Sequence, residues 1–110
     1  MTSAQTPFAR FAASVAGGAA PPAGLGAPLE ALWFDARGDW TKAHELAQSA
    51  GGGDGAWVHA YLHRKEGDEM NAAYWYARAG RPAAAGPLAA EWRDIAEALL
   101  RNGPQVEASS

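Results

Sequence analysis

"ALWFDARGDWTKAHELAQSAG", residues 31–51, is the most informative stretch for the fold, because a second stretch with the same spacing follows it: "AYLHRKEGDEMNAAYWYARAG", residues 60–80. The two stretches align without a gap at an offset of 29 residues, which places Gly-Asp at 38–39 over Gly-Asp at 67–68. Glycine ends one helix and aspartate caps the next. An alanine four residues after each aspartate lets two short helices approach closely. The pattern therefore predicts two consecutive helix hairpins.

Glycine and proline divide the rest of the chain into further helices. Prolines at 7 and 28 open helices, and the glycine-rich stretch "GGGDG" at 51–55 reads as a loop with Asp54 as the next helix cap. Period-two alternation is missing, so no strand is expected. The predicted fold class is all-α: a compact bundle within one domain, 1–110. Its expected parts are an N-terminal helix with a flexible connection (1–28), two hairpins (about 29–81) and a C-terminal capping helix (87–102).

Composition excludes several classes of function. The net charge is -3 and no Lys/Arg stripe occurs, so neither nucleic acid nor a membrane is expected as a partner. The chain has no cysteine, which excludes disulfides, thiolate zinc sites and thiol catalysis. No signal-peptide pattern or membrane-spanning run is found, and we expect a cytoplasmic protein.

The repeated spacing A-x6-G-D-x3-A-x6-A-G resembles the helix pair of tetratricopeptide repeats, and "NAAYWYARAG", residues 71–80, resembles the second helix of their Sel-like relatives. The resemblance covers residues 29–80, and the wider stretch is similar to short uncharacterised bacterial proteins. It implies hairpins whose first helices line a groove for an extended peptide. Because the period is short and two units are present, we expect a compact bundle instead of an extended solenoid.

The segment 57–66 places its histidines on one side of a predicted helix. His59 and His63 are four residues apart, so both can bind one metal ion, and Glu66 can add a carboxylate. A third imidazole would have to come from His44. The favoured interpretation is that these imidazoles pack between helices and hydrogen-bond, with no cofactor or metal expected; metal binding is the alternative.

The opposite side of the same helix carries Trp57, Tyr61 and Arg64, with Lys65 beside them. By the resemblance, these four residues would face a partner, and aromatic residues with arginine are typical of interface hot spots. The competing interpretation is that the terminal helices cover this side. Asp35 and Asp39, on either side of a helix break, are interpreted as caps.

The favoured function is therefore a non-catalytic protein- or peptide-interaction module. It requires an exposed Trp57, Tyr61 and Arg64 surface, through which the chain can also form a homodimer. The alternative is a small-molecule- or metal-binding helical protein, possibly an enzyme, that uses His59, His63, Glu66 and His44. The sequence decides neither the partner nor the presence of catalysis, although it favours a protein that is not an enzyme.

Overall fold

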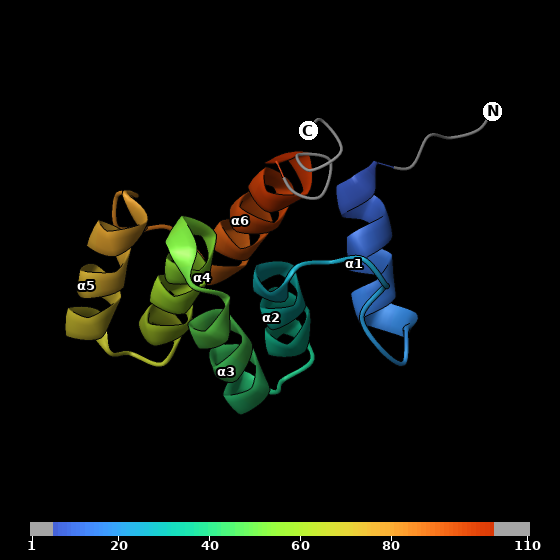
Figure 1. The fold of residues 1–110 in the computed structure, drawn as a ribbon, viewed down its shortest axis with the longest axis horizontal. Coiled ribbons are helices and arrows are strands. Elements are labelled where there is room, and N and C mark those ends of the chain that lie inside the picture. The colour runs from blue at the N-terminus through green and yellow to red at the C-terminus, as the bar shows by residue number, and fades with distance from the viewer. Residues whose placement is uncertain (1–5, 103–110) are drawn as a thin grey trace.

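The computed structural model describes residues 6–102, and six helices occupy most of them (Figure 1). No strand occurs within this range, so the all-α prediction is confirmed. The outer parts of the expected 1–110 span, residues 1–5 and 103–110, lie outside the described residues. The helices are α1 (Pro7–Gly17), α2 (Ala27–Ala36), α3 (Trp40–Ala50), α4 (Gly52–Lys65), α5 (Glu69–Ala79) and α6 (Leu88–Asn102).

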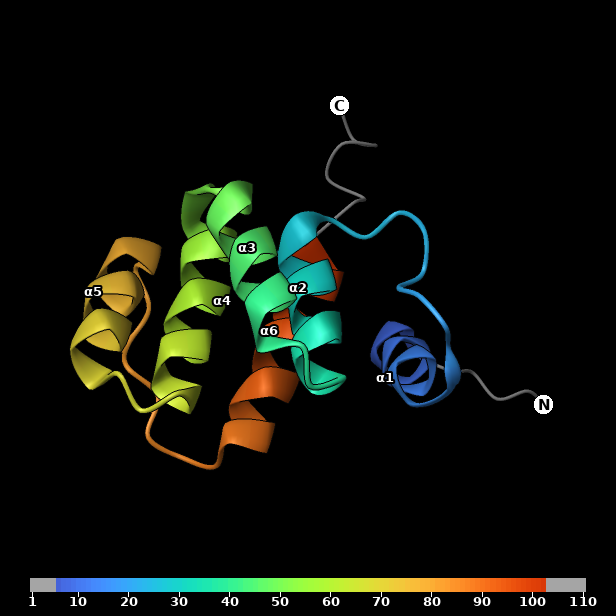
Figure 2. The same cartoon turned by 90° about the horizontal axis from the view of Figure 1, so that it is seen from below.

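The helices α2 to α5 lie in a row in chain order, and α6 crosses behind that row (Figure 2). Helix α4 is central, because it packs against α2, α3, α5 and α6. Helix α1 lies apart from the row and packs against α6. No helix among the described residues is long and apolar enough to span a bilayer.

Both Gly-Asp pairs act as the repeat predicts. The Asp39 carboxylate accepts a hydrogen bond from the Lys42 backbone N–H at 3.0 Å, and that of Asp68 accepts one from the Asn71 N–H at 3.2 Å. The preceding glycine of each pair has a φ near +90°, which favours glycine over any other residue. The start positions of α3 and α5 follow directly from these two pairs.

The predicted cap at Asp54 is wrong. Helix α4 begins at Gly52, with Gly51 as its N-cap and no side-chain cap hydrogen bond. Gly51 and Gly52 have φ values of 66° and 65°, which let the chain turn from α3 into α4 within the glycine run. Asp54 therefore lies in the first turn of the helix, inside the stretch expected to be a loop.

The core forms where the hairpin alanines let the helices approach. The equivalent pairs Ala31 and Ala60, and Ala43 and Ala72, are all buried, with exposures of 0 to 4 %. The larger core cluster contains Ala31 and Ala43, and its largest fully buried side chains are Leu32, Val58, Leu62 and Ile95. These come from α2, α4 and α6, so the capping helix supplies part of the interior of the bundle.

Helix α1 is attached to this bundle by aromatic contacts. The Trp92 ring of α6 stacks on Phe11 of α1 at 5.6 Å and meets Phe8 edge-on at 6.0 Å. The same indole donates its N–H to the carbonyl of Leu32 at 3.0 Å. Arg37 adds hydrogen bonds to carbonyls at the end of α1, including that of Val15 at 3.2 Å. These contacts hold α1 over the junction of α2 and α6.

We expect Asp39→Ala and Asp68→Ala each to lower the free energy of unfolding by about 1 kcal/mol, because each removes a cap hydrogen bond. Asp54→Ala serves as the matched control and should cost less, about 0.5 kcal/mol, because Asp54 contributes only its charge near a helix N-terminus. Urea unfolding followed by circular dichroism measures all three. If Asp54→Ala lowered the free energy of unfolding as much as the other two substitutions do, the assigned start of α4 would be contradicted.

Candidate metal centre

All three histidines of the chain meet between α3 and α4. His44 comes from α3, and His59 and His63 come from successive turns of α4. One ring nitrogen of each residue lies within 4.8 Å of those of the other two. The Nε2 atoms of His44 and His59 are 2.9 Å apart, so one donates a hydrogen bond to the other according to the tautomers. The sequence placed two of these residues on one helix face, and the packing of α3 adds the third.

Two tryptophans border the cluster. The Trp40 ring stacks on His44, with centroids 4.8 Å apart, and the Trp75 ring stacks on His59 at 4.0 Å. His59 and His63 also stack on each other at 4.9 Å. These contacts restrict the orientation of the imidazoles. The two tryptophans also exclude water from one face of His44 and one face of His59. The sequence placed Trp40 in an apolar stripe and Trp75 in the core, and neither pattern indicated that they border a site.

His63 has an unsatisfied polar atom. Its Nδ1 is buried and has no hydrogen-bond partner among the described residues. The Glu66 carboxylate lies 3.2 Å away and that of Asp68 lies 3.8 Å away, which allows ion pairs with a protonated ring but not an aligned hydrogen bond. A buried nitrogen without a partner costs free energy, and a bound ion or water is an ordinary explanation for one.

Burial favours the neutral form of two of the three imidazoles, those of His59 and His44. Desolvation and, to a smaller extent, the neighbouring imidazoles of His44 and His63 together lower the pKa of His59 to about 4. Desolvation also lowers the pKa of His44, followed by the effect of His63. A neutral imidazole has a free lone pair, and this is the form that binds a metal ion. At neutral pH at least these two rings are therefore in their ligand form.

The centre of the predicted partner surface, Tyr61, is buried, whereas Trp57 and Arg64 are half-buried and Lys65 is exposed. Tyr61 is 3 % exposed and donates its hydroxyl to Asp35 at 3.1 Å. Arg64 donates to Glu91 at 2.8 Å, across to α6. The interaction module requires Trp57, Tyr61 and Arg64 to be exposed. For Tyr61 this prediction is wrong, because α2 and α6 cover this side of α4. Binding of a partner stays a prediction.

Trp57 and Lys65, the remaining residues of that predicted surface, also make contacts within the chain. The Arg81 guanidinium lies 3.7 Å from the centroid of the half-buried Trp57 ring. Lys65, with 39 % of its side chain exposed, pairs with Asp35 at 2.9 Å. The sequence therefore missed the role of Asp35, which is a buried partner of α4 and not a helix cap. Its position before a Gly-Asp break gave no signal of burial.

Glu91 is a second buried acid that the sequence did not single out. It is 7 % exposed and accepts hydrogen bonds from Arg64 and from the Tyr76 hydroxyl. Burial and the bond to Glu91 raise the pKa of Tyr76 well above its ordinary value. Glu91 thus joins α4, α5 and α6, which is a structural role.

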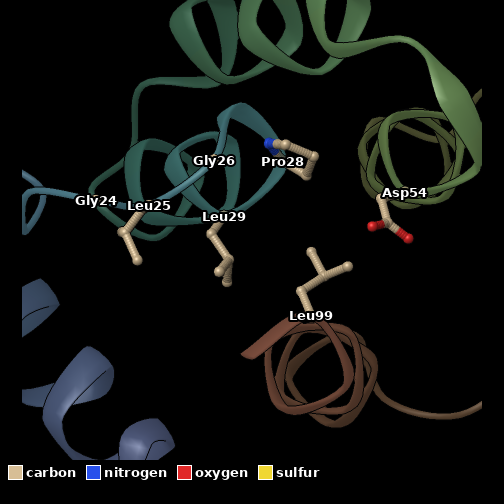
Figure 3. A pocket seen from close by; sticks show the side chains of 7 residues that line it. All are labelled: Gly24, Leu25, Gly26, Pro28, Leu29, Asp54 and Leu99. Carbon is tan, nitrogen blue, oxygen red and sulfur yellow. The ribbon is translucent and has the colours of Figure 1, made fainter. Parts of the chain in front are cut away.

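A cavity of about 360 Å³ lies between α2, α4 and α6, beside the connection that follows α1 (Figure 3). Its walls are formed by Leu25, Leu29 and Leu99, and the Asp54 carboxylate stands at its edge. Among the described residues that line it, Asp54 is the single ionisable one. The cavity therefore lacks the converging polar groups found at the histidine cluster.

Comparison of the chain with protein-family models, with curated proteins and with solved structures finds no match. The functional argument therefore depends on the geometry of the described residues.

The folded protein should lose stability as the pH falls. Because the pKa of His59 is about 4 when folded and 6.5 when unfolded, the unfolded chain takes up the proton first, and stability is lost between these two pH values. Between pH 7.5 and pH 5 the loss from this residue is on the order of 2 kcal/mol.

Urea unfolding of wild type and His59→Gln at both pH values isolates this contribution. The variant should show a smaller difference between the two pH values, whatever its stability at pH 7.5. An equal difference in both proteins would show that His59 titrates normally in the fold.

Proposed function

We propose that this chain binds one divalent transition-metal ion, most suitably Zn²⁺, through His44, His59 and His63. The observation that carries the proposal is the convergence of three imidazole nitrogens within 4.8 Å, in a cluster where the buried Nδ1 of His63 lacks a hydrogen-bond partner. Three imidazoles form one of the ligand sets that hold zinc in proteins. The described residues contain no other such group of three histidine or carboxylate ligands.

The ligand chemistry favours zinc over hard cations. Imidazole nitrogens suit zinc, copper and nickel, whereas Mg²⁺ and Ca²⁺ prefer oxygen ligands. Three protein ligands leave a fourth position of the zinc tetrahedron for water or a carboxylate. The site therefore belongs to the open kind, although ion binding alone is proposed here.

Binding of the ion would require the imidazoles to shift and turn, because their ligand nitrogens now lie up to 4.8 Å apart and the His59 and His63 rings are stacked. With Zn–N bonds of about 2.0 to 2.1 Å, ligand nitrogens in a tetrahedral site lie about 3.4 Å apart. His44 and His59 have their Nε2 atoms 2.9 Å apart, because they share a hydrogen bond. The ion would replace that hydrogen bond and separate the two atoms by about 0.5 Å.

Glu66 supports the site in one of two ways. If the ion takes Nε2 of His63, the Glu66 carboxylate, which lies 3.2 Å from Nδ1, would need only to turn to accept a hydrogen bond from that atom and orient the ring. If the ion takes Nδ1, the same carboxylate lies close enough to become the fourth ligand. In both cases the removal of its charge weakens the binding.

The ion would also join the two hairpins. His44 belongs to the hairpin of α2 and α3, whereas His59 and His63 belong to that of α4 and α5. A ligand that binds only the folded state stabilises it by mass action, by about 2.7 kcal/mol at 100 times Kd. Zinc should therefore raise the resistance of the whole bundle to unfolding.

The interaction module predicted from the sequence stays a prediction. Burial of Tyr61 removes the centre of the surface on which it was based, so metal binding has the stronger geometric support.

Isothermal titration of Zn²⁺ into chelator-treated protein tests the proposal. Wild type should bind one ion per chain, and His44→Gln and His63→Gln should each lose most of the affinity because each removes a ligand. Glu66→Gln should weaken binding by about 10-fold or more. The matched control Glu69→Gln, an exposed carboxylate on α5, should leave it unchanged.

The same proteins can be unfolded in urea with and without zinc. Stabilisation of wild type, and its loss in the histidine variants, would connect binding to the fold. Zinc that binds the histidine variants as tightly as wild type, or an absence of saturable binding, would overturn the proposal and leave the cluster as a packing feature.

A further inference from the structure

A second site lies on the other side of α4 and is independent of the proposed metal ion. A pocket of about 400 Å³ opens between α1, α2, α4 and α6, and we call it the inter-helix pocket. Val15 of α1 and Leu88 and Trp92 of α6 supply apolar walls. The volume is near the lower end for small-molecule sites, which are mostly apolar with a few polar groups that fix orientation. It suits a compact ligand of one or two rings.

Three polar side chains converge on the inter-helix pocket. The Asp35 carboxylate accepts hydrogen bonds from the Tyr61 hydroxyl at 3.1 Å and from the Lys65 ammonium at 2.9 Å. The side chain of Asp35 is 2 % exposed, and that of Lys65 is 39 % exposed. All three residues line the pocket. A buried polar group in a mostly apolar cavity is what gives such a site its selectivity.

The Asp35 carboxylate and the Lys65 ammonium have unused hydrogen-bonding capacity. A carboxylate offers about four acceptor positions and an ammonium three donors. Asp35 uses two acceptor positions in the bonds above, and Lys65 uses one donor. A ligand in the pocket can therefore donate to Asp35 and accept from Lys65.

The charges select against an ionised ligand. Asp35 and Lys65 neutralise each other, so the site as a whole offers no net attraction to either sign. For a ligand carboxylate the attraction to Lys65 is offset by repulsion from Asp35, and for a ligand ammonium the attraction to Asp35 is offset by repulsion from Lys65, so neither recovers the cost of its own desolvation. A neutral hydroxyl fits both, because it donates one hydrogen bond and accepts another.

We propose that the inter-helix pocket binds a neutral, mainly apolar alcohol or phenol, with its hydroxyl between Asp35 and Lys65. The apolar body lies against Val15, Leu88 and Trp92. The affinity comes from the buried apolar area, and the selectivity comes from the hydroxyl, because an analogue without the donor leaves the buried carboxylate without its new partner.

The probe is 2-naphthol, which is neutral at pH 7, measured by isothermal titration in the presence of a chelator so that the histidine cluster has no part in the result. Its matched analogue is 2-methoxynaphthalene, which keeps the rings and the oxygen but cannot donate. We expect saturable binding of one 2-naphthol, and binding of the analogue weaker by about 10-fold or more, as for a hydrogen bond to a charged group.

Substitutions at two neighbouring residues test whether 2-naphthol binds in the inter-helix pocket. Ala89 and Ala90 are both exposed on α6, but only Ala89 lines the inter-helix pocket. Ala89→Phe should fill the pocket and lower the affinity for 2-naphthol by at least 10-fold, whereas Ala90→Phe should bind like wild type. Both variants avoid the buried Asp35, whose removal would disturb the fold, and circular dichroism confirms that each is helical.

Three results would overturn the proposal: no saturable binding of 2-naphthol, equal binding of the two naphthalenes, or undiminished binding by folded Ala89→Phe. The comparison of the two ligands tests it even if Ala89→Phe does not fold. None of these results affects the zinc proposal, since all measurements are made without metal.

Discussion

The fold depends on the burial of α4, a helix that carries polar side chains into the interior on two sides. A buried polar group must find a partner, and α4 finds its partners on the helices that surround it. Toward α2, Tyr61 donates to Asp35; toward α3, His59 meets His44. Because α4 packs against four other helices, almost none of its faces is left to solvent. The histidine cluster and the inter-helix pocket are two consequences of this one constraint.

Much of the fold could be predicted because its signals are local. The caps at Asp39 and Asp68 depend on backbone groups three residues away, so the repeated Gly-Asp pairs located two helix starts directly. The start of α4 was missed at Asp54 for the opposite reason. A run of glycines permits many backbone paths, and the path taken, with positive φ at Gly51 and Gly52, is chosen by the packing of α3 on α4 and not by the run itself.

The sites were predictable only in part. The spacing of His59 and His63 required both rings to share a face of α4, and this local geometry holds in the structure. Which face of α4 meets solvent is not a local property, since it depends on where α6 returns after more than twenty residues. That is why the sequence left open whether Tyr61 faces a partner or is covered by the terminal helices. It is also why Asp35 was not recognised as the partner of Tyr61 and Lys65.

The repeat itself distinguishes packing from function at the histidines. At an offset of 29 residues, His59 corresponds to Glu30 and His63 to Phe34, while His44 corresponds to Ala73. The helix hairpin therefore folds with a carboxylate, an apolar ring or a methyl group at the positions where the cluster has imidazoles, so its fold does not require histidine there. An apolar ring in place of His63 would avoid the buried Nδ1 that has no partner, which costs about 1 to 3 kcal/mol. Three imidazoles that converge at such a cost are poorly explained by packing alone, and an ion bound among them would offset the cost.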